Sequence, residues 1–210
     1  MKSYTIFFGL IFFLNPLSSL FAYSFYAGIG GGFGSTTWKA LIPREEKQNM
    51  AVSLSTPIEV EEGGGMWGAQ LGYEFTSHFA IEATYKHYPK ATINFSQDSL
   101  FAFDNNDRTL FKSYTQQAAL MAKIMARFLE TNVHIYSSAG VADCHREDEI
   151  LNQWQILPTF GIGFNYNFSQ HFMGEIGGNY TAGYGESELS PADNFLPFLY
   201  SIFFSLSYRF

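Results

Sequence analysis

The stretch YSIFFSLSYRF, residues 200–210, ends the chain and decides the fold. Every second residue counted back from Phe210 is apolar or aromatic, and those between are mostly small or polar. A strand built from it has one apolar and one polar face. A soluble protein rarely ends on such a strand, because an exposed apolar edge promotes aggregation. A barrel in lipid has no edge, and lipid covers its apolar face. The stretch therefore predicts a transmembrane β-barrel.

The first residues predict export. Lys2 is followed by an apolar run over residues 4–14, which Asn15-Pro16 interrupts, and small residues up to Ala22 provide a cleavage region. This is the pattern of a signal peptide over residues 1–22. The mature chain, residues 23–210, then forms one barrel domain. A retained anchor or a buried N-terminal helix stays open as the alternative.

The composition after residue 22 agrees with a barrel. It contains no apolar run of the length that a membrane-spanning helix needs. Aromatic residues make up 19% of the chain and charged residues only 15%. Cys144 is the single cysteine, which excludes an intramolecular disulfide and leaves its role open.

Alternating segments can be marked along the chain, and their connections predict the topology. The segments are residues 23–35, 66–76, 79–88, 114–128, 133–142, 155–168, 172–183 and 196–210. Short connections at residues 77–78, 129–132 and 169–171 alternate with long ones at 36–65, 89–113, 143–154 and 184–195. We therefore expect an all-β, eight-stranded antiparallel up-and-down barrel with short periplasmic turns and four longer outer loops. Both termini then lie in the periplasm.

Three features leave the fold open in places. Residues 117–128 are rich in helix-forming Ala, Met, Leu and Lys, although they alternate like a strand. Pro158 cannot donate to a ladder hydrogen bond, so we expect a bulge or the outer end of the sixth strand there. A soluble barrel of the lipocalin type is the main alternative architecture.

Charge separates the loops from the strands. The four long connections hold seven basic and fifteen acidic residues, a net charge of −8, while the strands and short turns sum to zero. The strand charges lie on the polar parity, inside an eight-stranded barrel that is filled by side chains. Buried charges must pair. We therefore predict an ion network in the lumen, formed by Glu74, Glu82, Lys86, Lys123, Arg127, His134 and Glu175. The inward glycines of residues 28–34 leave room for it, unless they only make that strand flexible.

Several motifs together resemble a known family. They are FYAG at residues 25–28, LGYEF at 71–75 leading into FAIEATY at 79–85, GIGFNY at 161–166 and SYRF at 207–210. They resemble the small outer-membrane barrels grouped with the OmpA transmembrane domain and the opacity-type surface antigens, over residues 23–210. The resemblance implies a Gram-negative outer membrane, contact with outer-membrane lipids and lipopolysaccharide, and periplasmic chaperones and barrel-assembly machinery during biogenesis. Tyr208 and Phe210 resemble the C-terminal assembly signal of such barrels.

Catalytic chemistry is not expected, and neither is a cofactor or metal site. His134 and Ser137 are three residues apart on one strand, so they face opposite sides, which is wrong for a nucleophile and its base. The acidic residues of 143–149 and of 59–62 are expected to be solvated, and divalent-ion binding there stays open. Acidic loops disfavour nucleic acid.

The function that the sequence favours is that of a monomeric structural or surface-interaction protein, adhesin- or antigen-like, with a charge-paired, closed lumen. Its outer loops contact a host or surface ligand. A narrow channel for small solutes is the alternative, and a lipid A-modifying enzyme is a third. Aromatic residues at the strand ends, Trp38 among those at the outer end, are expected to form two interfacial girdles.

Overall fold

The computed structural model describes residues 24–38, 57–95, 110–148, 151–184 and 196–210. The signal peptide expected at residues 1–22 lies outside them. The described residues form strands β1 (Ser24–Ser35), β2 (Pro57–Glu61), β3 (Gly64–Thr76), β4 (Phe79–His87), β5 (Ala91–Phe95), β6 (Leu110–Arg127), β7 (Val133–Glu147), β8 (Asn152–Asn167), β9 (Phe172–Thr181) and β10 (Leu199–Arg209). No helix in these ranges is long and apolar enough to cross a membrane.

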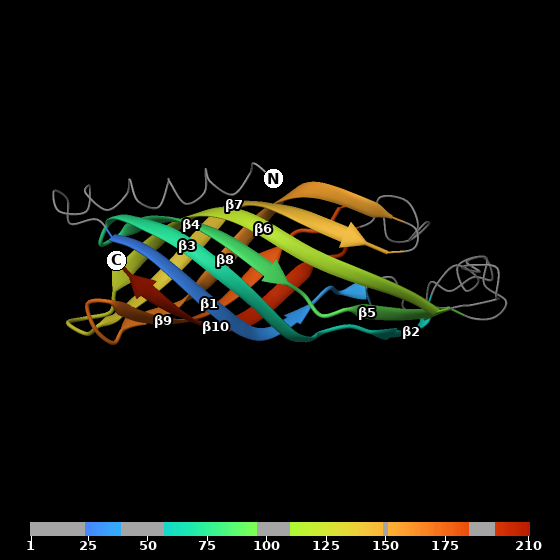
Figure 1. Ribbon diagram of the computed structural model, residues 1–210, viewed down its shortest axis with the longest axis horizontal. Helices are drawn as coiled ribbons and strands as arrows, with labels where there is room; N and C mark the ends of the chain where they lie inside the picture. The colour runs from blue at the N-terminus through green and yellow to red at the C-terminus, as the bar shows by residue number, and fades with distance from the viewer. Residues whose placement is uncertain (1–23, 39–56, 96–109, 149–150, 185–195) are drawn as a thin grey trace, which may run out of the picture.

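Eight of the strands close into an antiparallel barrel (Figure 1). Each of β1, β3, β4, β6, β7, β8, β9 and β10 pairs with two neighbours in this ring. Pairing of β1 with β10 joins the first and last of the described strands, and pairing of β6 with β7 completes the circle. The predicted eight-stranded architecture is therefore confirmed. The short connections and the C-terminus lie at one end of the barrel, called the turn end below, and the other end is called the loop end.

The two faces of the strands have the predicted parity. Ile29, Ile124 and Ile162 point outward and are 73%, 65% and 68% exposed. Lys123 and Glu175 point inward and are each 1% exposed. β6 alternates between buried and exposed residues along nearly all of its length, so a helix at residues 117–128 is wrong. Alternation outweighed helix propensity there, because only a strand places Lys123 inside and Ile124 in lipid.

Two strands, β2 and β5, lie inside connections that we expected to be loops. β2 pairs with β5, and β5 pairs with residues 110–113 of β6, so a small sheet extends the barrel at the loop end (Figure 1). We call this sheet, together with Trp38, the extension. Its apolar side chains form their own core: Trp38, Val60, Ala91, Ile93, Phe95 and Phe111. Both strands have five residues, too short for their alternation to be recognised in the sequence. Trp38 is 1% exposed in this core, so its placement in an interfacial girdle is wrong.

The hairpin of β7 and β8 is longer than expected. The two strands stay in continuous register from Val133–Tyr166 to Glu147–Asn152, so the predicted outer loop of residues 143–154 shrinks to a connection at residues 148–151. Pro158 lies within β8 opposite Val141 without a register shift, which rules out the bulge. Pairing of β8 with β9 begins at Thr159, so Pro158 does mark the loop end of that ladder. Its missing N–H therefore interrupts no pairing with β9.

The seam between the first and last strands ends on the terminal residue. Phe210 N–H donates to the carbonyl of Phe25 at 2.9 Å, and the rings of these two residues are 5.7 Å apart. Phe210 also contacts Tyr208, with ring centroids 5.1 Å apart. The last residue thus closes the ladder at the turn end and contributes an exposed aromatic ring to the outer face.

Deleting Phe210 should reduce assembly into the outer membrane more strongly than removing another aromatic ring at the same end. The deletion removes the last seam hydrogen bond together with half of the proposed assembly signal, Tyr208 and Phe210. Most of the chain should then fail to reach the folded form in cells, as measured by the protease-resistant fraction of the membrane. Phe128→Ala is the control, because Phe128 is also exposed at the turn end. Equal assembly of both variants would contradict the assembly-signal role.

Candidate functional site: the charged layer inside the barrel

Lys123 lies at the centre of the barrel interior, between two carboxylates from opposite walls. Its Nζ is 2.5 Å from Glu175 Oε2 on β9 and 3.2 Å from Glu82 Oε2 on β4. All three side chains are nearly inaccessible to solvent. One ammonium cannot neutralise two carboxylates, so this cluster alone has an excess negative charge. In a low-dielectric interior such an excess requires further donors.

Two tyrosines supply those donors. Tyr26 Oη donates to Glu82 Oε2 at 2.7 Å, and Tyr136 Oη donates to Glu175 Oε1 at 2.7 Å. The ammonium of Lys123 also lies 4.0 Å from the centre of the Tyr136 ring. Each carboxylate therefore accepts from Lys123 and from one tyrosine, and such charge-assisted hydrogen bonds are the stronger kind.

Glycines allow these tyrosines to reach across a neighbouring strand. Gly72 is the register partner of both Tyr26 and Glu82, and a Cβ at Gly72 would lie 2.1 Å from Cζ of Tyr26. The Tyr26 ring therefore lies against Gly72. On the other side of the barrel, a Cβ at Gly177 would meet Tyr136 Oη at 2.1 Å. A larger residue at either glycine would remove the space that the tyrosine occupies.

Lys86 supplies the second positive charge. Its Nζ donates to Asn179 Oδ1 at 2.6 Å and lies 4.3 Å from the centre of the Phe203 ring. Lys86 and Glu82 are each 6% exposed. We call Glu82, Lys86, Lys123 and Glu175 the charged layer. Its formal charges sum to zero, which is how a buried set of charges avoids the cost of an uncompensated ion.

The other predicted network residues lie elsewhere. Glu74 accepts from Arg209 at 2.8 Å and from Ser24 at 2.9 Å, in a partly exposed pair at the turn end. Arg127 is exposed and donates to the backbone carbonyl of Thr131 at 2.6 Å, so it does not belong with the charged layer. His134 is half-buried and forms no hydrogen bond or ion pair with the part of the chain that the structure describes. Arg127 is the last residue of β6 and His134 is the second residue of β7, so both lie at the turn end of the barrel and not in the middle of its interior.

Sequence reasoning missed the uncharged members of the site. Tyr26, Tyr136 and Asn179 contact the charged layer, whereas the predicted network contained only acidic and basic residues. The parity could have found the tyrosines. Tyr26 stands between Phe25 and Ala27, which both face outward, and Tyr136 follows outward Ile135. A tyrosine on the polar parity of a barrel strand points into the lumen, where its hydroxyl needs a partner.

An apolar layer lies between the charged layer and the loop end. It consists of Tyr88, Ala119, Met121, Ala142, Cys144, Leu157, Leu196 and Leu199. Cys144 therefore faces inward in apolar surroundings, on the side of β7 opposite to Asp143 and His145. The alternation along β7 thus places Cys144 on the inner face and Asp143 and His145 on the outer face, so these three residues cannot bind one divalent ion together.

Above the apolar layer, Arg146 connects the barrel wall with the extension. Its side chain is fully buried, pairs with Asp148, and lies 4.7 Å from the ring centre of Trp38 and 5.7 Å from that of Phe111. Asp148 also accepts from Ser113 at 3.2 Å and from the Leu151 N–H at 2.8 Å. The guanidinium is thus held between two aromatic rings and one carboxylate, a geometry that suits arginine better than lysine.

The barrel interior has little free space beside the charged layer. One interior cavity of about 20 Å³ lies beside the charged layer and is lined by Met66, Glu82, Lys86, Tyr136 and Phe203, among others. A single water needs about 10–15 Å³ of such volume, so this space holds about one water molecule.

His134 and Ser137 do not form a nucleophile–base pair. Ser137 is exposed on the outer face, whereas His134 is on the other face of β7.

Comparison with known proteins gives one family and several solved folds. A family model described as an OmpA-like transmembrane domain matches residues 22–210. Neisserial surface protein A matches with a TM-score of 0.52 and 8% identity, over 89% of this chain and 97% of that one. The outer membrane protein OprG from Pseudomonas aeruginosa matches with a TM-score of 0.52 and 12% identity, over 88% and 95%. No curated protein matches.

Proposed function

This chain belongs to the OmpA-like transmembrane domain family and is an outer-membrane β-barrel, and from that premise we propose that it is a closed barrel that anchors a surface-interaction module. In this proposal the turn end and both termini face the periplasm, and the loop end faces the outside. The extension and the acidic connections around it then contact a host or surface ligand. Contact with outer-membrane lipids follows from the location, and lipopolysaccharide is one of the proposed partners.

The small interior cavity is the observation that supports the closed state. A path through the barrel would have to cross both the charged layer and the apolar layer. The charged layer is held by direct contacts of 2.5–3.2 Å between Lys123 and its two carboxylates. At the level of the apolar layer the buried polar side chain of Gln117 is bonded to Tyr88 and Thr181. A channel for small solutes would need a continuous polar path, and a cavity of about 20 Å³ does not provide one.

The extension supports the surface role. Its core of six buried apolar residues, with Arg146 between Trp38 and Phe111, gives part of the loop region a fixed shape. Residues 36–65, 89–113, 143–154 and 184–195 contain the whole net negative charge of residues 23–210. A fixed surface with one predominant sign of charge attracts ligands of the opposite sign and increases their rate of association.

Planar-bilayer recording of the purified chain tests the closed barrel. We expect no stable open steps, because the cavity beside the charged layer holds about one water molecule and the buried charges around it are in direct contact. Protease-resistant β-sheet in vesicles of the same lipid serves as the control for insertion. Reproducible single-channel steps from the wild-type protein would overturn the closed-barrel proposal in favour of the narrow channel.

The proposed orientation is tested separately on intact cells. One epitope tag is inserted after Asp148, in the connection between β7 and β8 at the loop end, and another after Ser169, in a connection at the turn end. Antibody should bind intact cells with the first tag only, and both tags should bind after the outer membrane is opened. Labelling of the Ser169 tag alone on intact cells would reverse the orientation and refute surface presentation of the extension.

A further inference from the structure

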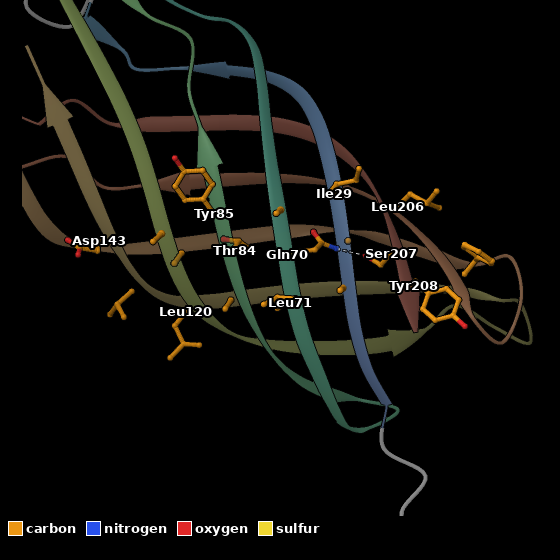
Figure 2. Close-up of a pocket in the computed structure, with 18 of the residues that line it drawn as sticks. Ile29, Gln70, Leu71, Thr84, Tyr85, Leu120, Asp143, Leu206, Ser207 and Tyr208 are labelled. Carbon is orange, nitrogen blue, oxygen red and sulfur yellow. Dashed lines mark hydrogen bonds between the residues drawn. The ribbon is translucent and has the colours of Figure 1, made fainter. Parts of the chain in front are cut away.

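The barrel is closed in one way near its middle and in another way at the loop end. In the middle, side chains of the wall meet each other: Gln70 Nε2 on β3 donates to Ser207 Oγ on β10 at 2.9 Å, with Gly28 of β1 between them in register (Figure 2). At the loop end the chain itself crosses the opening. Residues 36–38 leave the end of β1 and lead to Trp38 in the core of the extension. We call residues 36–38 the strap.

The strap connects opposite walls of the barrel. In the ring, β3, β4 and β6 separate β1 from β7 on one side, and β10, β9 and β8 separate them on the other. The strap follows Ser35 of β1, and the ring centre of Trp38 lies 4.7 Å from the guanidinium of Arg146 on β7. Three residues span at most about 10 Å, so the strap passes over the opening rather than along its rim.

Contacts hold the strap at both ends. On the side of β1, Thr37 Oγ1 donates to the carbonyl of Phe198, just before β10, at 2.7 Å. On the opposite side, the Trp38 ring meets Phe111 edge-on with centroids 5.9 Å apart and lies under the guanidinium of Arg146. Trp38 therefore gains both apolar burial and a cation–π contact from the closed position.

The closed position also has two local costs. Thr37 has a φ of 37°, in the left-handed region, where a β-branched side chain is crowded against its own backbone. Thr36 Oγ1 is buried and forms no hydrogen bond with any residue that the structure describes. The same is true of Thr115 Oγ1, which lies in register with Arg146 on the inner face. Both costs disappear when the strap moves away and water enters, so they favour release.

We propose that the strap is a releasable closure of the barrel at its loop end. In the released state Trp38 leaves Arg146, Thr37 leaves the left-handed region, and water reaches the inner face around Thr115. Trp38 belongs to the core of the extension as well as to the strap. A surface partner that binds the extension only with Trp38 in place therefore keeps the loop end closed. The proposal goes beyond the surface role and does not depend on whether the lumen below the strap conducts.

Thiol labelling of the whole chain in detergent micelles tests the strap. Thr115→Cys in a Cys144→Ala background places the single thiol of the chain on the inner face beside Arg146. A water-soluble methanethiosulfonate should label it far more slowly in the folded chain than in the urea-unfolded chain. Trp38→Leu should raise the folded rate at least about tenfold, because ring burial and the cation–π contact are lost. Equal folded and unfolded rates, or no increase with Trp38→Leu, would overturn the proposal.

Two controls separate release of the strap from loosening of the barrel. Trp154→Leu removes a tryptophan that is exposed on the outer face of β8, so the labelling rate should stay unchanged. Met125→Cys, used in place of Thr115→Cys, reports on the interior at the turn-end side of Lys123. Trp38→Leu should not change labelling there. Equal acceleration at both cysteines would mean that the whole barrel loosens, which contradicts a local closure.

Two substitutions of Thr37 separate the hydrogen bond from the backbone strain. Thr37→Val removes the hydroxyl and keeps the β-branch, so labelling of Thr115→Cys should become about fivefold faster. Thr37→Ala also removes the hydroxyl but relieves the crowding at a φ of 37°, so its rate should lie between those of the parent chain and Thr37→Val. Equal rates for the two variants would refute the role of strain in release. Open steps in bilayer recordings would refute only the closed lumen.

Discussion

Replacing Lys123 with methionine is expected to destabilise the barrel by about 3–5 kcal/mol, the usual effect of removing one partner of a buried ion pair. Methionine has a similar length, so the main change is the loss of charge. Glu82 and Glu175 would remain buried with only a tyrosine donor each. The free energy of unfolding, measured by urea titration in detergent or lipid vesicles, is the quantity to compare. Because unfolding must stay two-state for this comparison, two spectroscopic probes should give coincident transitions.

Two further variants separate charge from packing at this site. Arg127→Met removes a cation from the same strand, but Arg127 is exposed, so little stability should be lost. Combining Lys123→Met with Glu175→Gln removes one charge of each sign, so the charged layer stays neutral and much of the lost stability should return. If this double variant is as unstable as Lys123→Met alone, packing of the lysine rather than charge compensation holds the layer together.

Gly72→Ala is expected to lower stability by about 1.5–3 kcal/mol, the range for a lost hydrogen bond to a charged group. The added methyl would overlap the ring of Tyr26, which must then move away from Glu82. The same unfolding measurement applies. Near-ultraviolet circular dichroism should also change, because the tyrosine leaves its packed position.

Gly65→Ala is the matched control for this substitution. Gly65 lies on the same strand, and a Cβ there would meet nothing within 4 Å. It should leave stability unchanged. Tyr26→Phe in the otherwise unchanged protein is the second control. It removes the hydroxyl that donates to Glu82 and keeps the ring, so its loss of stability measures the hydrogen bond alone. Equal effects of Gly72→Ala and Gly65→Ala would show that glycine matters here only for backbone conformation.

The sequence predicts the barrel well because period-two alternation shows which side chains of each strand face lipid and which face the interior. Ile124 next to Lys123 leaves only one orientation for β6, whatever its helix propensity. Strand ends were predicted less well. Polar alternation continues in β7 past Ala142 to Glu147, where lipid no longer demands apolar side chains, so the pattern weakens although pairing goes on.

The candidate site was predicted in part, for a reason that lies in three dimensions. Parity placed Glu82, Lys86, Lys123 and Glu175 in the interior. Parity does not give depth along the barrel axis, so Arg127 and His134 could not be told apart from residues in the middle. Glu82 lies on β4, which pairs with β6, but the contact of Lys123 with Glu175 on β9 depends on the stagger between strands that do not pair, and no local pattern encodes that.

The length of β6 has a consequence for how a partner would be received. β6 has 18 residues, whereas about 9–11 residues suffice to cross a bilayer. The strand that contains Lys123 also contains Phe111, so the extension is joined to the barrel by one uninterrupted strand. A ligand that docks there does not have to order the core of the extension first. Less conformational entropy is lost on association, and weak contacts suffice for a measurable affinity.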